Sequence, residues 1–396
     1  MAEHKKSRYL SGKEVRAIAK ANAKTMMALE KRKHRKADES EFVTEMKNPA
    51  NILEVEDLHT YFFTDQGIVK AVNGVSFDVP KNATVGIVGE SGCGKSVTSM
   101  SIMQLLQAPQ GQICDGHIRF LSHEYKKDAK GNIIPEEMED KVLDIANMPI
   151  SQIHRVRGRQ IAMIFQEPMT SLNPVFTIGN QLDEVTLIHV PGATKEMAKA
   201  KSLEMLSLVG IADPAHVYSS FPHELSGGMR QRVMIAMALA CNPRLIIADE
   251  PTTALDVTIQ AQILELLRDV KQRMDGSILL ITHDLGIIAE MADYVVVMYA
   301  GRVIEKGTVQ EIFHNPMHPY TIGLQKSKPT LNTNEEILFN IPGNVPNPIN
   351  MPSFCFFRER CDRACEKCGG DYPGFVQVSP THYVACHLYG EENGNG

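Results

Sequence analysis

A glycine-rich segment constrains the fold of this chain more than any other feature of its sequence. It reads Gly89-Glu90-Ser91-Gly92-Cys93-Gly94-Lys95-Ser96, follows the apolar run 85–88 and precedes a helix-like segment that extends through Leu106. A strand, a glycine loop and a helix in this order are typical of a phosphate-binding loop, because backbone N–H groups and the helix N-terminus then face anionic oxygens. A simple turn is the alternative, but the flanking strand and helix favour nucleotide binding.

The residue types within this loop predict how a nucleotide would be held. Lys95 would reach the β- and γ-phosphates, and Ser96 would bind Mg²⁺. The residues that we expect to contact the nucleotide are Gly89, Ser91, Gly92, Cys93, Gly94, Lys95, Ser96 and Val97.

Length and hydropathy bound the class of protein. The 396 residues are enough for a full-sized core and two or three structural units. No apolar run approaches the roughly 18 to 20 residues of a membrane-spanning helix, because charged residues interrupt the candidate at 277–300. The N-terminus carries charge without an apolar stretch behind it, so we expect no signal peptide and a cytoplasmic location.

Charge is distributed unevenly along the chain. Residues 1–47 hold 13 Lys and Arg against seven Asp and Glu, although the net charge of the whole chain is −6. The acidic remainder argues against a nucleic-acid partner. The basic N-terminal extension could contact anionic lipid or another subunit, but we expect a solvated, partly helical extension.

Two adjacent carboxylates follow a predicted buried strand. The apolar residues 245–248 lead into Asp249 and Glu250. Asp249 would act on Mg²⁺, mostly through the water shell that this ion tends to keep. Glu250 would accept a proton from the attacking water or orient it. Surface charge is the alternative interpretation of such a pair.

Polar side chains also directly follow two other short apolar segments. Gln166 follows 161–165, and His283 follows 277–282. Because α/β proteins bind ligands at the carboxyl ends of parallel strands, we expect Gln166 and His283 to lie near Glu250. His283 would hydrogen-bond the γ-phosphate, although a lone histidine is more often structural.

Three further segments complete the predicted layout. Apolar and polar residues alternate from 52 to 79, with a turn at 65–67, which predicts an antiparallel β layer. In this layer Phe62, beside Tyr61, either stacks on adenine or is an ordinary core aromatic. Residues 168–239 are predicted to be mostly helical, with breaks at Pro174, Pro191 and Pro214. Residues 122–150 are predicted to form an exposed insertion.

The helical segment contains Leu225-Ser226-Gly227-Gly228-Met229-Arg230-Gln231, a turn that opens another helix. With the motifs above, it resembles the signature of the nucleotide-binding subunits of ATP-binding cassette (ABC) transporters, over about residues 51–310. The resemblance implies ATP and Mg²⁺, with Ser96, Gln166 and Asp249 around the metal. It also implies a head-to-tail pair of domains, in which Ser226, Gly227 and Gly228 serve the neighbour's nucleotide and Asp256, in Ala254-Leu255-Asp256, lies at the interface.

A finer resemblance involves His318-Pro319-Tyr320-Thr321 and the run from Ile161 to Gln181, which includes Gln166 to Pro174. Both are similar to the oligopeptide, dipeptide and nickel importer ATPases. It covers about 51–120 and 151–390. It implies an ATPase that drives peptide uptake at the cytoplasmic side of the cell membrane. The implied partners are a paralogous ATPase, two permease subunits and an extracytoplasmic peptide-binding protein, with Gln166 linking the γ-phosphate to the permease.

Five cysteines crowd into the last 45 residues: Cys355, Cys361, Cys365, Cys368 and Cys386. In a cytoplasmic protein this favours a metal site over disulfides. Four thiolates can hold Zn²⁺ or an iron–sulfur cluster, and unligated thiols are the third possibility. The importer resemblance implies a [4Fe–4S] cluster on Cys355, Cys361, Cys368 and Cys386, with Cys365 as a surplus thiol. It would act as a structural clip for a poorly apolar tail.

The predicted fold class is therefore a RecA-like P-loop NTPase core with an N-terminal antiparallel β layer, a helical subdomain and a small cysteine-rich C-terminal extension. The predicted boundaries are 1–47 for the basic extension, 48–310 for the ATPase domain with its helical subdomain at about 168–239, and 311–396 for the C-terminal extension. Two other functions stay open: a soluble cassette protein of translation or DNA repair, and a redox sensor whose ATPase is regulatory.

Overall fold

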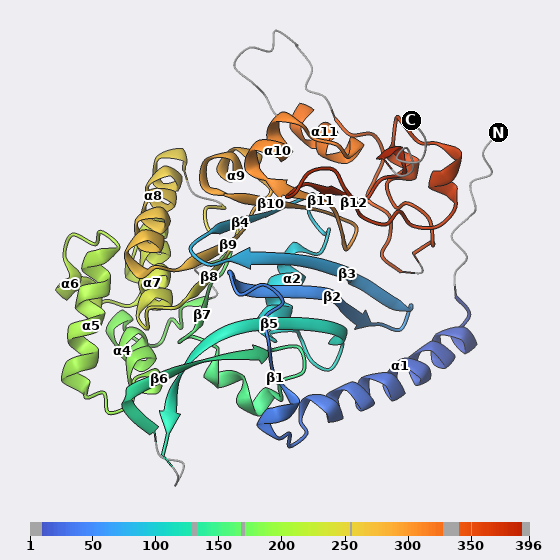
Figure 1. Cartoon of the computed structure of the whole chain (residues 1–396). Helices are drawn as coiled ribbons and strands as arrows, with labels where there is room; N and C mark the ends of the chain where they lie inside the picture. Colours follow the sequence, from blue (N-terminus) through green and yellow to red (C-terminus); the bar gives the residue numbers. More distant parts are fainter. Residues whose placement is uncertain are drawn as a thin grey trace.

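The computed structural model describes residues 10–128, 133–167, 171–253, 256–327, 340–349 and 351–389. Two β-sheets form its centre, and most of the helices lie around them (Figure 1). The strands are β1 (Val43–Thr44), β2 (Asn51–Phe63), β3 (Ile68–Pro80), β4 (Thr84–Val88), β5 (Gly111–Lys127), β6 (Ile133–Asp144), β7 (Ile161–Ile164), β8 (Leu245–Asp249), β9 (Ser277–Ile281), β10 (Tyr294–Tyr299), β11 (Arg302–Thr308), β12 (Val376–Gln377) and β13 (Tyr383–Val384).

The helices vary in length from single turns to the long N-terminal α1. The α-helices are α1 (Gly12–Lys33), α2 (Lys95–Ile102), α4 (Ile178–His189), α5 (Lys195–Leu208), α6 (Pro214–Ser219), α7 (Gly227–Leu239), α8 (Val257–Met274), α9 (Leu285–Met291), α10 (Val309–His314) and α11 (Pro319–Lys326). Short 3-10 helices occur at Glu39–Glu41, Ile150–Arg155, Pro222–Glu224, Arg358–Arg360, Glu366–Gly369 and His387–Tyr389. No helix in the described part of the chain is long and apolar enough to cross a membrane.

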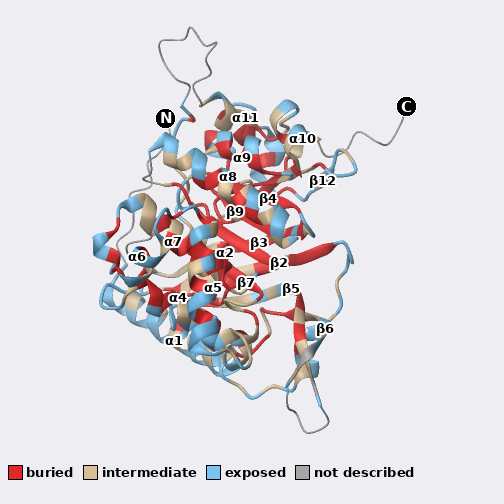
Figure 2. Ribbon diagram, turned by 90° about the vertical axis from the view of Figure 1, so that its left-hand side faces the viewer, coloured by how far each residue is buried: buried red, intermediate tan, exposed pale blue. Residues whose placement is uncertain are grey.

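The larger sheet has the strand order β12-β13-β11-β10-β4-β9-β8-β7, and its strands β10, β4, β9, β8 and β7 run parallel. Its central strands are buried on both faces, which explains their continuous apolar sequences. Neighbouring residues face opposite sides: Ile278 and Leu280 pack in one core, and Leu279 and Ile281 pack in the other. Figure 2 shows the buried residues concentrated along the strands.

The smaller sheet, β1-β6-β5-β2-β3, lies against one of these faces. The predicted turn at 65–67 joins β2 to β3, which confirms the hairpin. The prediction of an exposed insertion at 122–150 is wrong for most of its length, because β5 and β6 pair there as antiparallel strands. Glu124 is buried against Arg155 and Leu143 is in the core. The charged outward-facing residues obscured the strand alternation, and residues 129–132 lie outside the described residues.

The predicted helical region consists of α4, α5, α6 and α7, which contact one another at one end of the larger sheet (Figure 1). Side-chain oxygens begin each helix, at Thr177, Thr194, Asp213 and Ser226. Pro214 occupies the first turn of α6 instead of interrupting a helix, as its missing N–H permits.

The N-terminal helix α1 is docked on the smaller sheet (Figure 1), a contact that the sequence did not indicate. A capping box at Ser11 begins the helix. Asn22 Nδ2 donates to the carbonyl of Thr64 at 2.7 Å, and Arg32 Nη2 donates to the carbonyl of Ile113 at 3.1 Å. The helical prediction for this extension is confirmed, but its inner face is not simply solvated.

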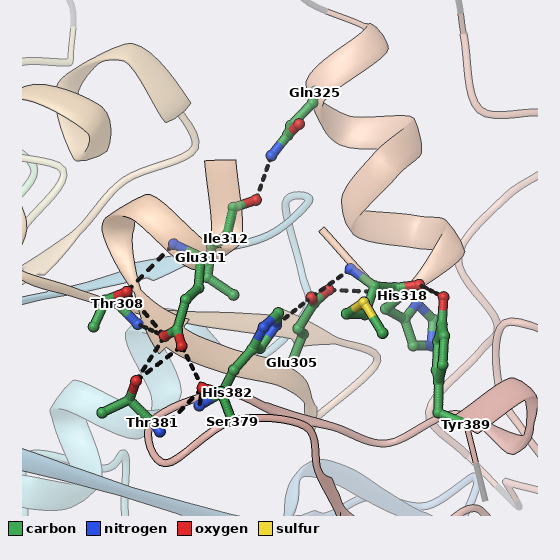
Figure 3. A network of polar contacts seen from close by, with 11 residues as sticks. Glu305, Thr308, Glu311, Ile312, His318, Gln325, Ser379, Thr381, His382 and Tyr389 are labelled. Atoms are coloured by element: carbon green, nitrogen blue, oxygen red, sulfur yellow. Dashed lines mark hydrogen bonds and ion pairs between the residues drawn. The ribbon is translucent and has the colours of Figure 1, made fainter. Parts of the chain in front are cut away.

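The C-terminal residues share the larger sheet with the core, because β13 pairs with β11. Figure 3 shows the polar network that attaches them. His382 Nε2 lies 2.8 Å from the fully buried Glu305, which also accepts from the backbone N–H groups of Met317 and His318. Ser379 and Thr381 donate to Glu311 on α10. The segment 376–389 is thus fixed by a buried polar contact to β11 and by more exposed ones to α10.

Candidate functional site

The glycine loop joins β4 to α2, as the sequence predicts. Gly89 and Gly94 have φ of +154° and +101°, and a Cβ there would come 2.2 Å from the carbonyl O of Met298 and 2.3 Å from that of Ala71. Only glycine fits both positions without displacing the backbone. Lys95 is buried, and its Nζ donates to the carbonyls of Gly89 at 2.8 Å and Glu90 at 3.2 Å. The ammonium group therefore lies inside the loop that would receive phosphates.

Ser96 and Asp249 meet across the ends of α2 and β8. Ser96 Oγ donates to Asp249 Oδ1 at 3.0 Å, and Ser99 Oγ donates to Oδ2 at 3.3 Å. Burial raises the pKa of the Asp249 carboxyl, and the two serine hydrogen bonds partly offset that rise. A hydroxyl beside a buried carboxylate offers the oxygen ligands that Mg²⁺ takes, directly or through its waters. Sequence reasoning missed Ser99, although its i+3 spacing places it on the helix face of Ser96.

Three donors surround the Glu250 carboxylate. Gln166 Nε2 donates to Oε2 at 2.9 Å, Thr253 Oγ1 donates to the same oxygen at 2.9 Å, and His283 Nδ1 lies 3.2 Å from Oε1. Glu250 itself has φ +48°, a strained conformation, and its N–H donates to the carbonyl of Ile281 at 2.8 Å. The structure thus brings together Gln166, Glu250 and His283 from the ends of three neighbouring strands. The contact of Thr253 was not predicted from the sequence.

These side chains remain open to ligand. The side chain of His283 is 62% exposed and that of Glu250 is 14% exposed. A carboxylate held by hydrogen-bond donors at a solvent-accessible strand end can orient a water molecule. Pro168, Met169 and Thr170, which follow Gln166 in the predicted permease-facing run, lie outside the described residues.

The aromatic pair on β2 points to opposite faces. Tyr61 Oη donates to Asn73 Oδ1 at 3.0 Å and its ring meets His59 edge-on. Phe62 is half-buried beside Gly111, where an added Cβ would come 2.8 Å from Phe62 Cε1. Phe62 is therefore the aromatic of the two without a polar attachment, and adenine stacking stays a prediction for it.

The signature residues lie on different elements from the glycine loop. Ser226 is the N-cap of α7 and accepts from the N–H of Met229, while Gly227 is exposed and Gly228 is half-buried. Gln231 Nε2 donates to the carbonyl of Pro251 at 2.6 Å, which joins α7 to the turn after Glu250. The sequence did not indicate this link.

Asp256 is exposed and begins α8 by accepting from the N–H of Ile259. Ala254 and Leu255 lie outside the described residues. The N-termini of α7 and α8 thus begin at the exposed residues Ser226 and Asp256, and a helix N-terminus is an end that favours anions.

The C-terminal cysteines are all free thiols. Cys368 and Cys386 are buried, and Cys355 and Cys361 are half-buried. Burial raises the pKa of Cys386 to about 11, and Cys355, Cys361 and Cys368 add to this rise by electrostatic repulsion. Within the described residues, no three His, Cys, Asp or Glu side chains form a group that could hold a metal ion. The predicted cluster is therefore not seen as a preformed ligand group.

Comparisons with known proteins agree with the fold. Residues 72–253 match the family described as ABC transporter, and residues 304–368 match the family described as oligopeptide/dipeptide transporter, C-terminal region. The fold resembles the dimeric structure of the bacterial ABC transporter cassette MJ0796, with a TM-score of 0.53 and 24% identity over 65% of this chain and 98% of that one. The architecture is that of an ABC ATPase, with mixed sheets and a helical subdomain.

Similarity to curated proteins extends over most of the chain. The oligopeptide transport ATP-binding protein AppD of Bacillus subtilis (strain 168) is 48% identical over 343 residues, which are 87% of this chain and 98% of AppD. The dipeptide transport ATP-binding protein DppD of the same organism is 48% identical over 337 residues, which are 85% of this chain and 94% of DppD. The chain belongs to this family of oligopeptide and dipeptide transport ATP-binding proteins.

Proposed function

We propose that this chain hydrolyses ATP to drive the import of oligopeptides or dipeptides through separate permease subunits, as a peripheral protein on the cytoplasmic side of the membrane. The observation that carries the proposal is the Glu250 carboxylate, held by Gln166 and His283 beside the Ser96–Asp249 pair. The names of the relatives supply the class of solute.

Catalysis would rest on positioning and electrostatics, since phosphoryl transfer leaves little covalent work for the protein. Lys95 would neutralise phosphate charge, and Ser96 and Asp249 would hold a Mg²⁺ ion that would neutralise further phosphate charge. Glu250 would orient the attacking water or accept its proton, and His283 would hydrogen-bond the γ-phosphate. Phe62 would stack on adenine.

The glycine loop would form only half of an ATP site. Two helix N-termini carry Ser226, Gly227 and Asp256, which are exposed, and Gly228, which is half-buried, and these residues would serve the nucleotide of a second cassette. We infer that this second cassette is a paralogue in a heterodimer. The pair of cassettes would close around ATP and open again after phosphate release. This cycle would do mechanical work, because ATP binds the closed and the open state of the pair with different affinity.

A groove in the helical subdomain would receive a permease segment. Its volume is about 600 Å³, and it lies between α4, α5 and α6 with Phe176, Leu187, Lys199 and Tyr218 among its lining residues. Val175 and Phe176 are exposed beside it. Gln166 directly precedes this subdomain in sequence. A change at the γ-phosphate would therefore reach the permease through Gln166. An extracytoplasmic peptide-binding protein would deliver the solute.

For the cysteine segment we propose a [4Fe–4S] cluster on Cys355, Cys361, Cys368 and Cys386, with Zn²⁺ as the alternative. Support comes from the crowding of these four cysteines between residues 355 and 386 and from their partial or full burial. The ligated metal would stabilise a tail that holds four prolines between residues 341 and 353.

The metal proposal is tested on protein purified without oxygen, by absorbance and by iron and zinc assays. Cys361→Ser should lose the bound metal, whereas Cys365→Ser should retain it. A colourless protein with stoichiometric zinc would exclude the cluster, and equal loss in both variants would contradict the ligand assignment.

The transport proposal is tested by purifying the intact membrane complex and identifying its subunits. We expect a second cassette and two permease subunits, and ATP hydrolysis that a loaded peptide-binding protein stimulates in liposomes. Recovery of the chain only with nucleic acid or ribosomes would favour a soluble cassette protein instead.

A further inference from the structure

The glycine loop carries an acidic residue that is held from the far end of the chain. Arg360 Nη1 donates to Glu90 Oε2 at 2.7 Å, and Nη2 donates to Oε1 at 2.9 Å. The two side chains are separated by 270 positions in sequence and form a bidentate pair, with the Arg360 side chain 5% exposed and that of Glu90 28% exposed. A buried fork of this kind fixes both position and charge.

The guanidinium is held in place independently of Glu90. Arg360 Nε donates to the carbonyl of Pro342 at 2.9 Å, and the group lies 5.7 Å from the ring centre of Tyr299 and 5.9 Å from that of Phe357. It therefore sits on a rigid platform made by the C-terminal extension and the end of β10. The extension presents a fixed positive charge to the loop.

A second contact reaches the backbone of the same loop residue. Tyr320 on α11 is fully buried, and its Oη accepts from the N–H of Glu90 at 2.8 Å. Its ring packs at 4.7 Å from that of Tyr299. Glu90 is thus fixed through both its side chain and its N–H by residues outside the loop.

The position of Glu90 gives this attachment a consequence for nucleotide binding. It is the second residue of an anion-binding loop, and its carbonyl accepts from Lys95 Nζ. A free carboxylate there would repel a triphosphate and compete for Lys95. We propose that Arg360 is a positioning residue for ATP: it neutralises Glu90, turns the carboxylate away from Lys95 and holds the start of the loop ready for the phosphates.

This inference rests on ATP binding by the glycine loop and adds a role for the C-terminal extension. The affinity for nucleotide would depend on residues 341–361 and not on the loop alone. The second anchor of the extension, at Glu305 and Glu311 (Figure 3), does not contact the loop in the described residues and provides a control.

The experiment measures ATP and ADP affinity of the full chain by calorimetry, with KM and kcat for ATP hydrolysis in the assembled complex. Arg360→Gln should weaken ATP binding about tenfold, or about 1.4 kcal/mol, and ADP binding less, because ADP carries less charge. It should raise KM with little change in kcat. Arg360→Lys, which keeps the charge but loses the fork, should be intermediate.

The decisive variant is Glu90→Gln combined with Arg360→Gln. If Arg360 acts by neutralising Glu90, removal of both charges restores ATP affinity to within about twofold of Glu90→Gln alone. A double variant as weak as Arg360→Gln would overturn the proposal, as would unchanged affinity in Arg360→Gln. Glu90→Gln alone should bind ATP at least as tightly as the wild type, and a tenfold loss there would also overturn it.

Thr381→Val serves as the control for general loosening of the extension, because it removes two hydrogen bonds to Glu311 of 2.9 and 2.8 Å. Its ATP affinity should equal that of the wild type, and a loss equal to that of Arg360→Gln would assign the effect to loosening. Wild-type protein that fails to bind ATP would refute the proposed function itself, which separates the two outcomes.

Discussion

At the scale of single residues, the site depends on groups that neighbouring strands bring to one sheet edge. Gln166, Glu250 and His283 are polar residues directly after apolar runs, and parallel strands end at the same edge, so their proximity was predictable. Their catalytic roles remain proposals. The Glu90–Arg360 pair was not predictable, because a surface-type acid and a distant arginine carry no periodic signal that would pair them.

Glu250→Gln should leave ATP binding largely intact and reduce ATP turnover at least about 100-fold, because the amide cannot accept a proton from water. Its size and its contacts with Gln166 and Thr253 would be kept. The comparison is Thr253→Val, which removes one donor and should lower turnover less than tenfold. Phosphate release measured with both proteins checks this, and normal hydrolysis by Glu250→Gln would remove that residue from its assigned role.

Gly94→Ala should destabilise the loop by at least about 2 kcal/mol and abolish ATP binding. Its φ is +101°, and the new Cβ would meet the Ala71 carbonyl at 2.3 Å. Gly92→Ala is the matched control, since Gly92 has φ +78° but no atom of the described residues within 4 Å of an added Cβ. It should cost only about 1 kcal/mol of strain in the free energy of unfolding. Equal loss in both variants, measured by chemical denaturation, would contradict the steric explanation.

At the scale of elements, local sequence patterns identified what lies within one strand or helix. The β2–β3 hairpin was predictable from its alternation and turn, and α4 to α7 from their helical spacing and caps. The β5–β6 hairpin was missed because its outward-facing residues are charged. The docking of α1 was missed because its contacts, such as Asn22 with Thr64, are single hydrogen bonds between distant segments.

The attachment of α11 to the core should weaken in acid because of His318. Burial lowers the pKa of His318 to about 4, although Glu305 opposes the shift. The unfolded chain, with a histidine pKa of about 6.5, would therefore take up a proton between pH 6.5 and 4 that the folded chain does not. The free energy of unfolding should have its highest value above pH 6.5 and should fall by up to about 3 kcal/mol as the pH drops toward 4.

The variant for this test is His318→Asn, because asparagine can replace histidine as the cap of α11 by accepting from the N–H of Tyr320. It should be less stable at pH 7 but should lose less stability between pH 6.5 and 4. Denaturation curves at several pH values measure the slope of the free energy of unfolding against pH for the wild type and for the variant. Parallel slopes would mean that another group causes the acid sensitivity.

At the scale of the whole molecule, the glycine loop and the signature of this chain should serve different nucleotides. Gly228→Asp tests this separation. The new carboxylate at the N-terminus of α7 should not harm folding, since a negative charge favours that end of a helix, and Gly228 has only Ile259 near an added Cβ, at 3.4 Å. The same carboxylate would repel the γ-phosphate of a nucleotide bound by the partner cassette.

The isolated Gly228→Asp protein should therefore bind ATP as tightly as the wild type, while the assembled complex should lose ATP-driven closure and at least about 90% of hydrolysis at the partner's site. Met27→Asp adds the same charge at an exposed position on α1 and should change neither property. Calorimetry on the isolated chain and hydrolysis by the complex separate these effects. Weakened ATP binding by the isolated variant would show that the signature acts on the chain's own loop, and the half-site arrangement would then be wrong.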